Sequence, residues 1–214
     1  MTTRPHQVHS IVIGDAPEAW AAAGFAVEES TVTIANTALV LAGTGRGRGI
    51  LEAHVEGIGR DVDGMPFAAR TDAAAAVSPA ASPAGEHPNG IVDLDHLVAM
   101  SPDMDRTIAA LVDAGLDHRR SRTFAAGEHI RRQAFFWLGD VILELAGDDG
   151  AHDPGPASLW GLAFTSHDLT ATAGRLGELL GAPKPAVQPA REIATLRTGE
   201  LDISVPIVVM SPQP

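Results

Sequence analysis

Glu144 is the residue whose setting most strongly suggests chemistry. It stands between Leu143 and Leu145 in the apolar run VILELAG (141–147). An unpaired carboxylate in apolar surroundings is strongly unfavourable, so this glutamate should meet a cation, keep its proton or lie at the mouth of a cavity. The chain has no cysteine, which excludes thiol nucleophiles, zinc–thiolate sites and disulfides. Any metal ion must therefore be held by oxygen and imidazole ligands.

A second group of polar residues could line a cavity that binds an anion. They are Arg131, Gln133 and Trp137, which share one parity of the run HIRRQAFFWLG, and Arg191 and Arg197, which flank the run IATL. Guanidinium groups recognise carboxylates and phosphates, so these residues favour an anionic substrate. The alternative is that the arginines are solvated and protect strand edges from pairing.

The run TGRGRG (44–49) is rich in glycine but precedes a strand-like run and not a helix. A phosphate cradle of this kind requires the amino end of a helix. We therefore interpret the run as a hairpin loop and expect no nucleotide cofactor.

One pattern occurs three times along the chain and supplies the elements that would position these side chains. Each copy opens with an apolar strand-like run and continues with an aspartate that can cap a helix, and its helical run stops at a glycine. The caps and stops are Asp15 and Gly24, Asp103 and Gly115, and Asp168 and Gly181. Strand-like runs follow each helix, although in the third copy one of them is weak. The repeat predicts βαβββ units with the helix outside the sheet.

The chain is long enough, at 214 residues, to bury a substantial core without disulfides or a structural metal. The repeat predicts a first module at 6–60, an Ala/Pro-rich linker at 61–91, a second module at 92–148 and a third, degenerate module at 157–214. The fold class is therefore α+β.

The second copy, with DLDHLVAMSPDMDRTIAALVDAGL followed by FFWLGDVILELAG, resembles a module of the glyoxalase/bleomycin-resistance/dioxygenase superfamily, also called the vicinal oxygen chelate superfamily. The opening of the third copy is similar to a second module of that superfamily, and the first copy is a weaker match. The resemblance implies that paired modules form one curved mixed sheet, a cup of eight strands with helices outside and a ligand or metal inside.

The resemblance also implies a ligand set from the first and last strands of two paired modules. On this basis His96 and Glu144 match the second copy's ligands, and His9 and Glu52 occupy the corresponding places in the first copy. The third copy departs from the pattern, because Gly161 stands where a histidine is expected and SVPIVVM offers no carboxylate.

Because two of the three copies must pair to form the cup, two architectures are possible. If copies one and two pair, His9, Glu52, His96 and Glu144 could hold one divalent metal ion, with Glu144 also moving protons as a catalytic group. If copies two and three pair, only His96 and Glu144 remain, and the cup is a binding pocket or a site completed by water. We favour the first pairing slightly; the alternative to any metal site is hydrogen-bonded histidines and partly solvated glutamates.

The resemblance therefore implies either a glyoxalase-like enzyme, such as a metal-dependent lyase, isomerase or dioxygenase, or a metal-free protein that sequesters a small molecule, as drug-resistance members of the superfamily do. A formal net charge of −12 argues against a nucleic-acid partner. The sequence has neither a signal-peptide pattern nor a long apolar run, so we expect a cytoplasmic protein and no membrane partner. An odd number of modules leaves one half-cup uncovered, which predicts a homodimer.

Overall fold

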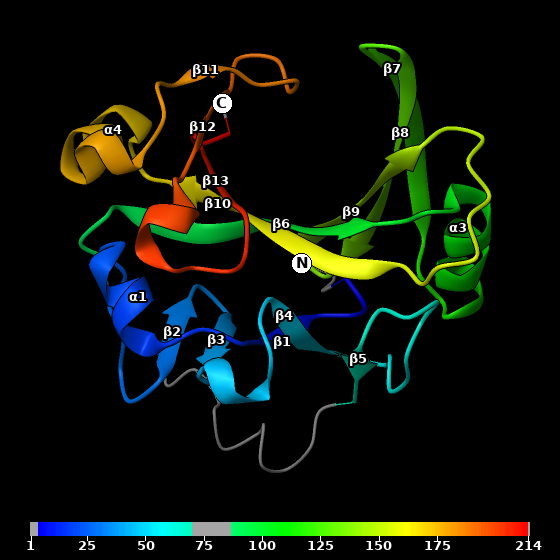
Figure 1. Cartoon of the computed structure of the whole chain (residues 1–214), viewed down its shortest axis with the longest axis horizontal. Helices are drawn as coiled ribbons and strands as arrows, with labels where there is room; N and C mark the ends of the chain where they lie inside the picture. The colour runs from blue at the N-terminus through cyan, green and yellow to red at the C-terminus, as the bar shows by residue number, and fades with distance from the viewer. Residues whose placement is uncertain (1–3, 70–86, 214) are drawn as a thin grey trace.

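A computed structural model describes residues 4–69 and 87–213 of the chain, which form two β-sheets (Figure 1). The first sheet has the order β2-β3-β1-β4-β5 and the second the order β11-β12-β13-β10-β6-β9-β8-β7. The strands of the first sheet are β1 (Val8–Ile13), β2 (Thr31–Ile34), β3 (Thr37–Leu41), β4 (Ile50–Val55) and β5 (Phe67–Ala68). Those of the second are β6 (Ile91–Met100), β7 (His118–Ala126), β8 (His129–Leu138), β9 (Val141–Asp148), β10 (Ser158–Ser166), β11 (Lys184–Pro185), β12 (Glu192–Thr195) and β13 (Ile207–Met210).

The second sheet is built from the second and third copies of the repeat. In each copy the first strand pairs in parallel with the last, β6 with β9 and β10 with β13. The two copies join where β6 and β10 pair antiparallel, which gives the sheet an approximate twofold symmetry. The predicted α+β class and the pairing of βαβββ modules into one curved sheet are confirmed, with copies two and three as the pair.

The helices of these two copies begin where the sequence predicts. Asp103 caps α3 (Met104–Asp113) by accepting from the Arg106 N–H, and Asp168 caps α4 (Leu169–Leu176) by accepting from the Ala171 N–H. Helix α4 ends earlier than expected: Gly177 has φ of +54° and opens a 3-10 turn, Gly177–Leu179, so the helix stops before Gly181. A further 3-10 turn, Thr198–Leu201, follows β12.

The first copy follows a different strand order. Its helix α1 (Pro17–Ala22) begins after Ala16 without a side-chain cap, so the prediction that Asp15 caps it is wrong. The Asp15 carboxylate accepts instead from Trp20 Nε1 and from Ser204. The parallel partner of β1 is β3, whereas β4 pairs antiparallel on the other side of β1.

The glycine-rich segment is not a hairpin loop, because β3 and β4 lie on opposite sides of β1. The segment contains a 3-10 turn, Thr44–Arg46, and crosses the end of β1. A Cβ atom on Gly14 would overlap the Gly47 carbonyl oxygen, so this close crossing requires glycine at position 14.

One core lies between the two sheets. Ile11 and Leu39 of the first sheet and Leu97, Leu143 and Phe164 of the second are fully buried in it. The first sheet therefore covers the outer, convex face of the second, and the concave face opens away from it between β7–β8 and β11–β12 (Figure 1). The odd module thus buries its apolar face within the chain, which removes the reason for expecting a homodimer. Among the described residues, no helix is long and apolar enough to cross a membrane.

Candidate functional site

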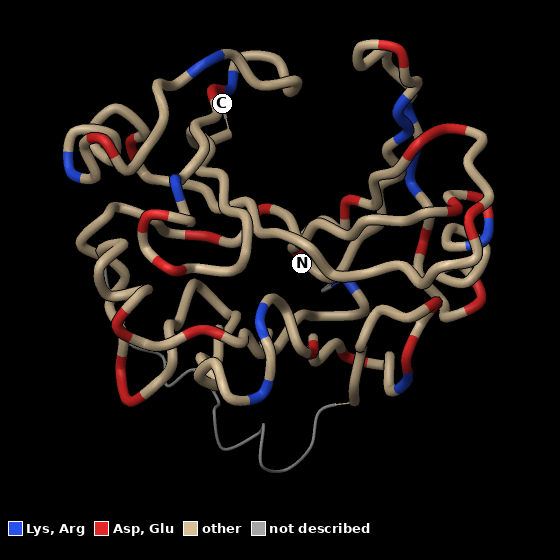
Figure 2. The backbone as a smooth tube through the Cα atoms, in the orientation of Figure 1, with Lys and Arg blue, Asp and Glu red and all other residues tan. Residues whose placement is uncertain are grey.

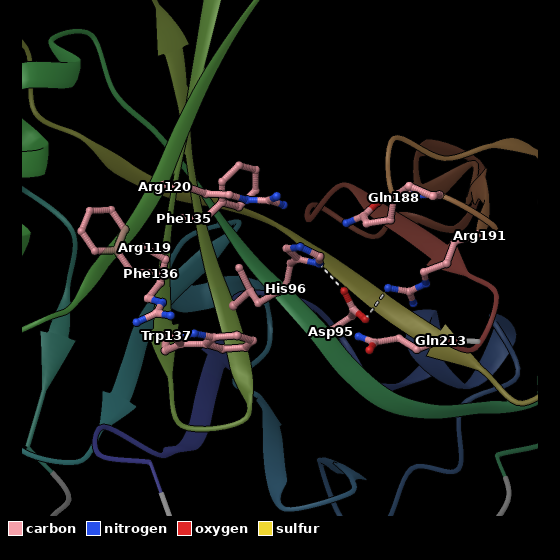
Figure 3. A pocket seen from close by; sticks show the side chains of 12 residues that line it. Asp95, His96, Arg119, Arg120, Phe135, Phe136, Trp137, Gln188, Arg191 and Gln213 are labelled. Atoms are coloured by element: carbon pink, nitrogen blue, oxygen red, sulfur yellow. Dashed lines mark hydrogen bonds and ion pairs between the residues drawn. The ribbon is translucent and has the colours of Figure 1, made fainter.

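The concave face of the eight-stranded sheet holds two adjoining cavities of about 450 and 630 Å³, within the size range of small-molecule sites. Both are lined by His96 on β6, Arg120 on β7, Phe135 on β8, and Gln188 and Pro189 after β11. The two walls of the cup therefore enclose one shared region, with His96 at its centre (Figure 3).

Glu144 lies in the same region as His96 because of the parallel register of β6 and β9. His96 pairs with Ile142 and Val98 with Glu144, so all four side chains lie on one face of the sheet. The Glu144 carboxylate accepts from Gln133 Nε2, and Gln133 Oε1 accepts from Arg122 Nε at 2.6 Å. A polar chain therefore runs from β7 across β8 to β9.

A second polar group forms the floor of the cup. His96 Nδ1 pairs with Asp95 Oδ2, and Asp95 Oδ1 accepts from Arg191 Nη1 at 2.9 Å (Figure 3). Arg191 also donates from Nε to the Ser211 carbonyl at 2.9 Å. Asp95, His96 and Arg191 are 9%, 2% and 4% exposed, so the three side chains have little freedom to move.

Both carboxyl groups have shifted pKa values, in opposite directions. Burial raises the pKa of Asp95, but the hydrogen bond and charge of His96 and the charge of Arg191 outweigh it and lower the pKa to about 2. Burial raises the pKa of Glu144, and the charges of His96 and Arg122 and the bond from Gln133 oppose this only in part. Asp95 is therefore a firmly ionised partner, whereas Glu144 holds its proton more strongly than an exposed glutamate.

The four residues proposed from the sequence as one metal site do not come together. His9 on β1 and Glu52 on β4 belong to the five-stranded sheet, which lies behind the cup. Glu52 Oε2 instead lies 3.4 Å from His54 Nε2, on the face opposite the core residue Ala53. The alignment of Glu52 with Glu144 is wrong because β4 is the antiparallel neighbour of its module's first strand, whereas β9 is the parallel one.

The third copy does not complete the set within the cup. By the symmetry of the sheet, Gly161 occupies the place of His96, since Gly161 pairs with Val98 as Ala163 pairs with His96. Val208 occupies the place of Glu144, since it pairs with Ala163 as Glu144 pairs with Val98. Within 4–69 and 87–213, no three His, Asp or Glu side chains cluster so that they could hold a metal ion. The residues present therefore do not fit the four-ligand metal site that the resemblance implies.

The residues predicted to bind a substrate divide into two groups. Gln133 and Trp137 line the cavities. Arg131 forms an ion pair with Asp148 at 2.7 Å near the end of the β8–β9 ladder, and Arg197 lies 3.4 Å from Glu200, with both side chains more than half exposed. Neither of these arginines lines the two cavities, so their solvated interpretation describes their surroundings better.

Sequence reasoning missed the basic and aromatic side chains that dominate the cup. Arg120 and Arg122 pair with Phe135 and Gln133 across the β7–β8 ladder. Paired residues share a face of the sheet, so the strand alternation that selected Gln133 could also have identified these two arginines. The Arg120 guanidinium lies 4.9 Å from the Phe135 ring centre. Lys184 lines the opposite wall, and basic residues lie on both walls in Figure 2. Among the described residues, no acidic side chain forms an ion pair with Arg120, Arg122 or Lys184.

No protein-family model and no curated protein sequence matches the chain. Solved structures do match. A mutant of 4-hydroxymandelate synthase from Streptomyces coelicolor has a TM-score of 0.63 at 12% identity, over 98% of this chain and 93% of that one. A variant of homoprotocatechuate 2,3-dioxygenase from B. fuscum has a TM-score of 0.61 at 13% identity, over 99% of this chain and 73% of that one.

A xylose isomerase-like TIM barrel/4-hydroxyphenylpyruvate dioxygenase fusion protein has a TM-score of 0.65 at 11% identity, over 99% of this chain and 50% of that one. At such identities the likeness concerns the fold alone. The chain has the vicinal oxygen chelate fold, and the resemblance inferred from the second and third copies is confirmed at that level.

Proposed function

We propose that the cup binds a small organic anion with an aromatic or branched apolar body, and that it does so without a metal ion. The observation that supports this most directly is the donor set. By the approximate twofold symmetry of the sheet, Gly161 and Val208 occupy the positions equivalent to His96 and Glu144. Two of the four expected metal ligands are therefore replaced by a hydrogen atom and an isopropyl group.

The lining of the cup supports an anionic ligand. Among the described residues Arg120, Arg122 and Lys184 line the cavity without a direct ion pair, and Arg122 reaches the Glu144 carboxylate only through Gln133, in a chain whose formal net charge is −12. Positive side chains concentrated in a concave, low-dielectric site attract anions strongly, and guanidinium groups bind a carboxylate with two hydrogen bonds. The ligand would therefore present its carboxylate to the arginine wall.

The remainder of the lining supports an apolar body for the ligand. Phe135 and Trp160 contribute aromatic faces, and Val208, Ile193 and Met210 contribute aliphatic ones. Trp160 is 49% exposed, which is unusual for so large an apolar side chain and is typical of a surface that a ligand covers.

The experiment compares phenylpyruvate and phenylacetate with the neutral amide phenylacetamide, using tryptophan fluorescence and calorimetry with and without a chelator. We expect the acids to bind more tightly than the amide, equally well with chelator and less tightly at high salt. Arg120→Gln and Arg122→Gln should each weaken binding about tenfold, whereas Arg46→Gln, in the exposed turn behind the cup, should not. Equal affinity for acid and amide, or a requirement for added metal, would contradict the proposal.

A second candidate function is an enzyme that transforms the bound anion. The Asp95–His96 pair favours it, because an oriented imidazole in a cavity is a recurrent general base. The prediction that Glu144 is catalytic also belongs to this candidate, since it lies on the same face as His96.

A further inference from the structure

A β-bulge in β6 places two adjacent side chains on the same face. Leu94 and Leu97 are both buried in the core between the sheets, although strict alternation would turn residues three apart to opposite faces. The pairing with β10 shifts between His96, opposite Ala163, and Leu94, opposite Phe164, so Asp95 is the extra residue. Bulges of this kind re-aim side chains next to functional sites, and here the bulge turns both Asp95 and His96 into the cup.

The surroundings of Asp95 fix the state of the imidazole. One oxygen of the Asp95 carboxylate accepts from Arg191 Nη1 at 2.9 Å, and the other is paired with His96 Nδ1, so the carboxylate is an acceptor for that nitrogen. The proton of a neutral imidazole therefore resides on Nδ1, which leaves the lone pair on Nε2.

That second nitrogen has nothing to bind within the part of the chain that the structure describes. His96 is 2% exposed, and its Nε2 atom is buried without a hydrogen-bond partner there. A buried polar atom without a partner is destabilising, so such an atom in a native site calls for an explanation. Because the ring lies between Arg120 and Gln188 in the shared region of both cavities (Figure 3), a ligand in the cup would be within its reach.

We propose that His96 is a catalytic base that removes and returns a proton on a carbon of the bound anion, without a metal ion, and that Asp95 is its positioning residue. The inference rests on the proposed function and extends it to a substrate class: 2-oxo acids that carry a hydrogen on the carbon next to the ketone. Their carboxylate suits the basic wall, and their carbon-bound proton is acidic enough for an imidazole once the enolate is stabilised.

The step balances without an oxidant, a reductant or a co-reactant. His96 Nε2 takes the proton as the C–H bond breaks, and that electron pair forms the C=C bond of the enolate. The carbonyl pair moves to oxygen, where the guanidinium of Arg120 holds the negative charge, as preorganised donors do in other active sites. The return of a proton from Nε2 to carbon restores the ketone. In D₂O the Nε2–H of the imidazolium exchanges with solvent before that return, so the nucleus delivered to carbon is deuterium.

The test follows deuterium incorporation at C3 of phenylpyruvate by proton NMR in D₂O, above the rate in buffer alone. We expect the protein to accelerate exchange equally with and without a chelator. His96→Ala should reduce the accelerated rate about 100-fold or more, and added imidazole should restore part of it, which a purely structural role of His96 would not allow. His129→Ala, at the exposed end of the β8 hairpin strand, is the matched control and should keep the full rate.

Asp95→Asn tests the positioning role. It should lower the exchange rate about tenfold or more, because the amide no longer fixes the tautomer, while phenylpyruvate affinity stays the same. Because this substitution leaves Arg191 without its charge partner, circular dichroism must first show a folded protein. If it does not, Asp95→Glu keeps the charge beside Arg191 but displaces the carboxylate from His96 Nδ1, and it should likewise lower the exchange rate while phenylpyruvate affinity stays the same.

The outcomes separate the two proposals. Binding of phenylpyruvate without accelerated exchange overturns the catalytic role of His96 and leaves the binding function standing. Exchange that is lost with chelator and restored by a divalent ion overturns the metal-free mechanism, whereas the absence of any binding overturns both proposals.

Discussion

At the scale of single residues, the cup is organised by two carboxyl groups whose surroundings differ. Asp95 is held directly by the His96 imidazole and the Arg191 guanidinium, whereas Glu144 meets an amide and only more distant basic groups. The sequence singled out Glu144 because two leucines flank it, and the structure places it on the cup's inner face as that setting suggested. The sequence did not indicate Asp95 as a site residue, because strict alternation along a strand would place its side chain on the face opposite to that of His96.

The first prediction concerns the pH dependence of Asp95. Its pKa is about 2 in the folded protein and close to 3.9 in an unfolded chain, so its stabilising contribution is complete above about pH 4 and is lost as the pH falls towards 2. We expect the difference in unfolding free energy between the native protein and Asp95→Asn to shrink by roughly 2 kcal/mol over that range. Urea unfolding at a series of pH values measures it.

Glu144→Gln provides a control of opposite sign. Burial raises the pKa of Glu144, so the native protein should lose stability relative to this variant as the pH rises above the unfolded value of about 4.3. If both variants change in the same direction with pH, the two environments have been misassigned.

At the scale of elements, the repeat was readable because helix caps are local. Asp103 and Asp168 cap their helices through bonds to a backbone N–H three residues ahead, and such a signal survives in the sequence alone. Strand order is not local: β4 and β9 both carry ILE or LEL patterns, yet they occupy different sides of their first strands. The four-ligand hypothesis failed on that difference, because nothing in the run ILEAH specifies which neighbour the strand will choose.

Strands β13 and β9 occupy equivalent positions in the two paired modules, and this equivalence predicts that a substitution in β13 can create a metal site. Val208 occupies the position of Glu144 and lines the same cavity, so Val208→Glu would add a third oxygen or nitrogen donor beside His96 and Glu144. Three protein ligands with an open position suffice for a divalent metal. We expect this variant, unlike the native protein, to bind Zn²⁺ or Mn²⁺ in calorimetry and to gain about 2.7 kcal/mol of stability at 100 times the Kd.

Ile193→Glu is the matched control, since Ile193 lines the same cavity from β12 but does not occupy the equivalent position. Without metal, both variants should be destabilised by roughly 1 kcal/mol, because each places a carboxylate in a partly buried apolar lining. Equal metal binding by the two variants would show that the symmetry relation does not govern the site.

At the scale of the whole molecule, the position of the first copy decides what the cup can do. The five-stranded sheet of the first copy covers the convex face of the eight-stranded sheet. The side chains that line the cup therefore come from copies two and three alone. The repeat predicted three modules and the family resemblance implied one curved sheet, but neither could predict which two modules would pair. That choice depends on apolar faces that match in three dimensions, and all three copies have such faces.

The last prediction tests whether the two sheets unfold as one unit. Asp15 is fully buried and accepts from Trp20 Nε1 at 3.1 Å, from the Ser204 N–H at 3.1 Å and from Ser204 Oγ at 2.6 Å, which ties the first copy to the third. Asp15→Ala leaves these donors without an acceptor, so we expect a loss of about 3 kcal/mol. Because one core spans both sheets, hydrogen exchange should accelerate in β1 and β9 together. Asp202→Ala is the control. Arg48 Nη2 lies 3.6 Å from Asp15 Oδ1 and 2.8 Å from Asp202 Oδ1, but the Asp202 side chain is 80% exposed, so its loss should cost less than about 1 kcal/mol. Faster exchange in β1 alone would instead mean that the first copy opens independently and that the cup stands without it.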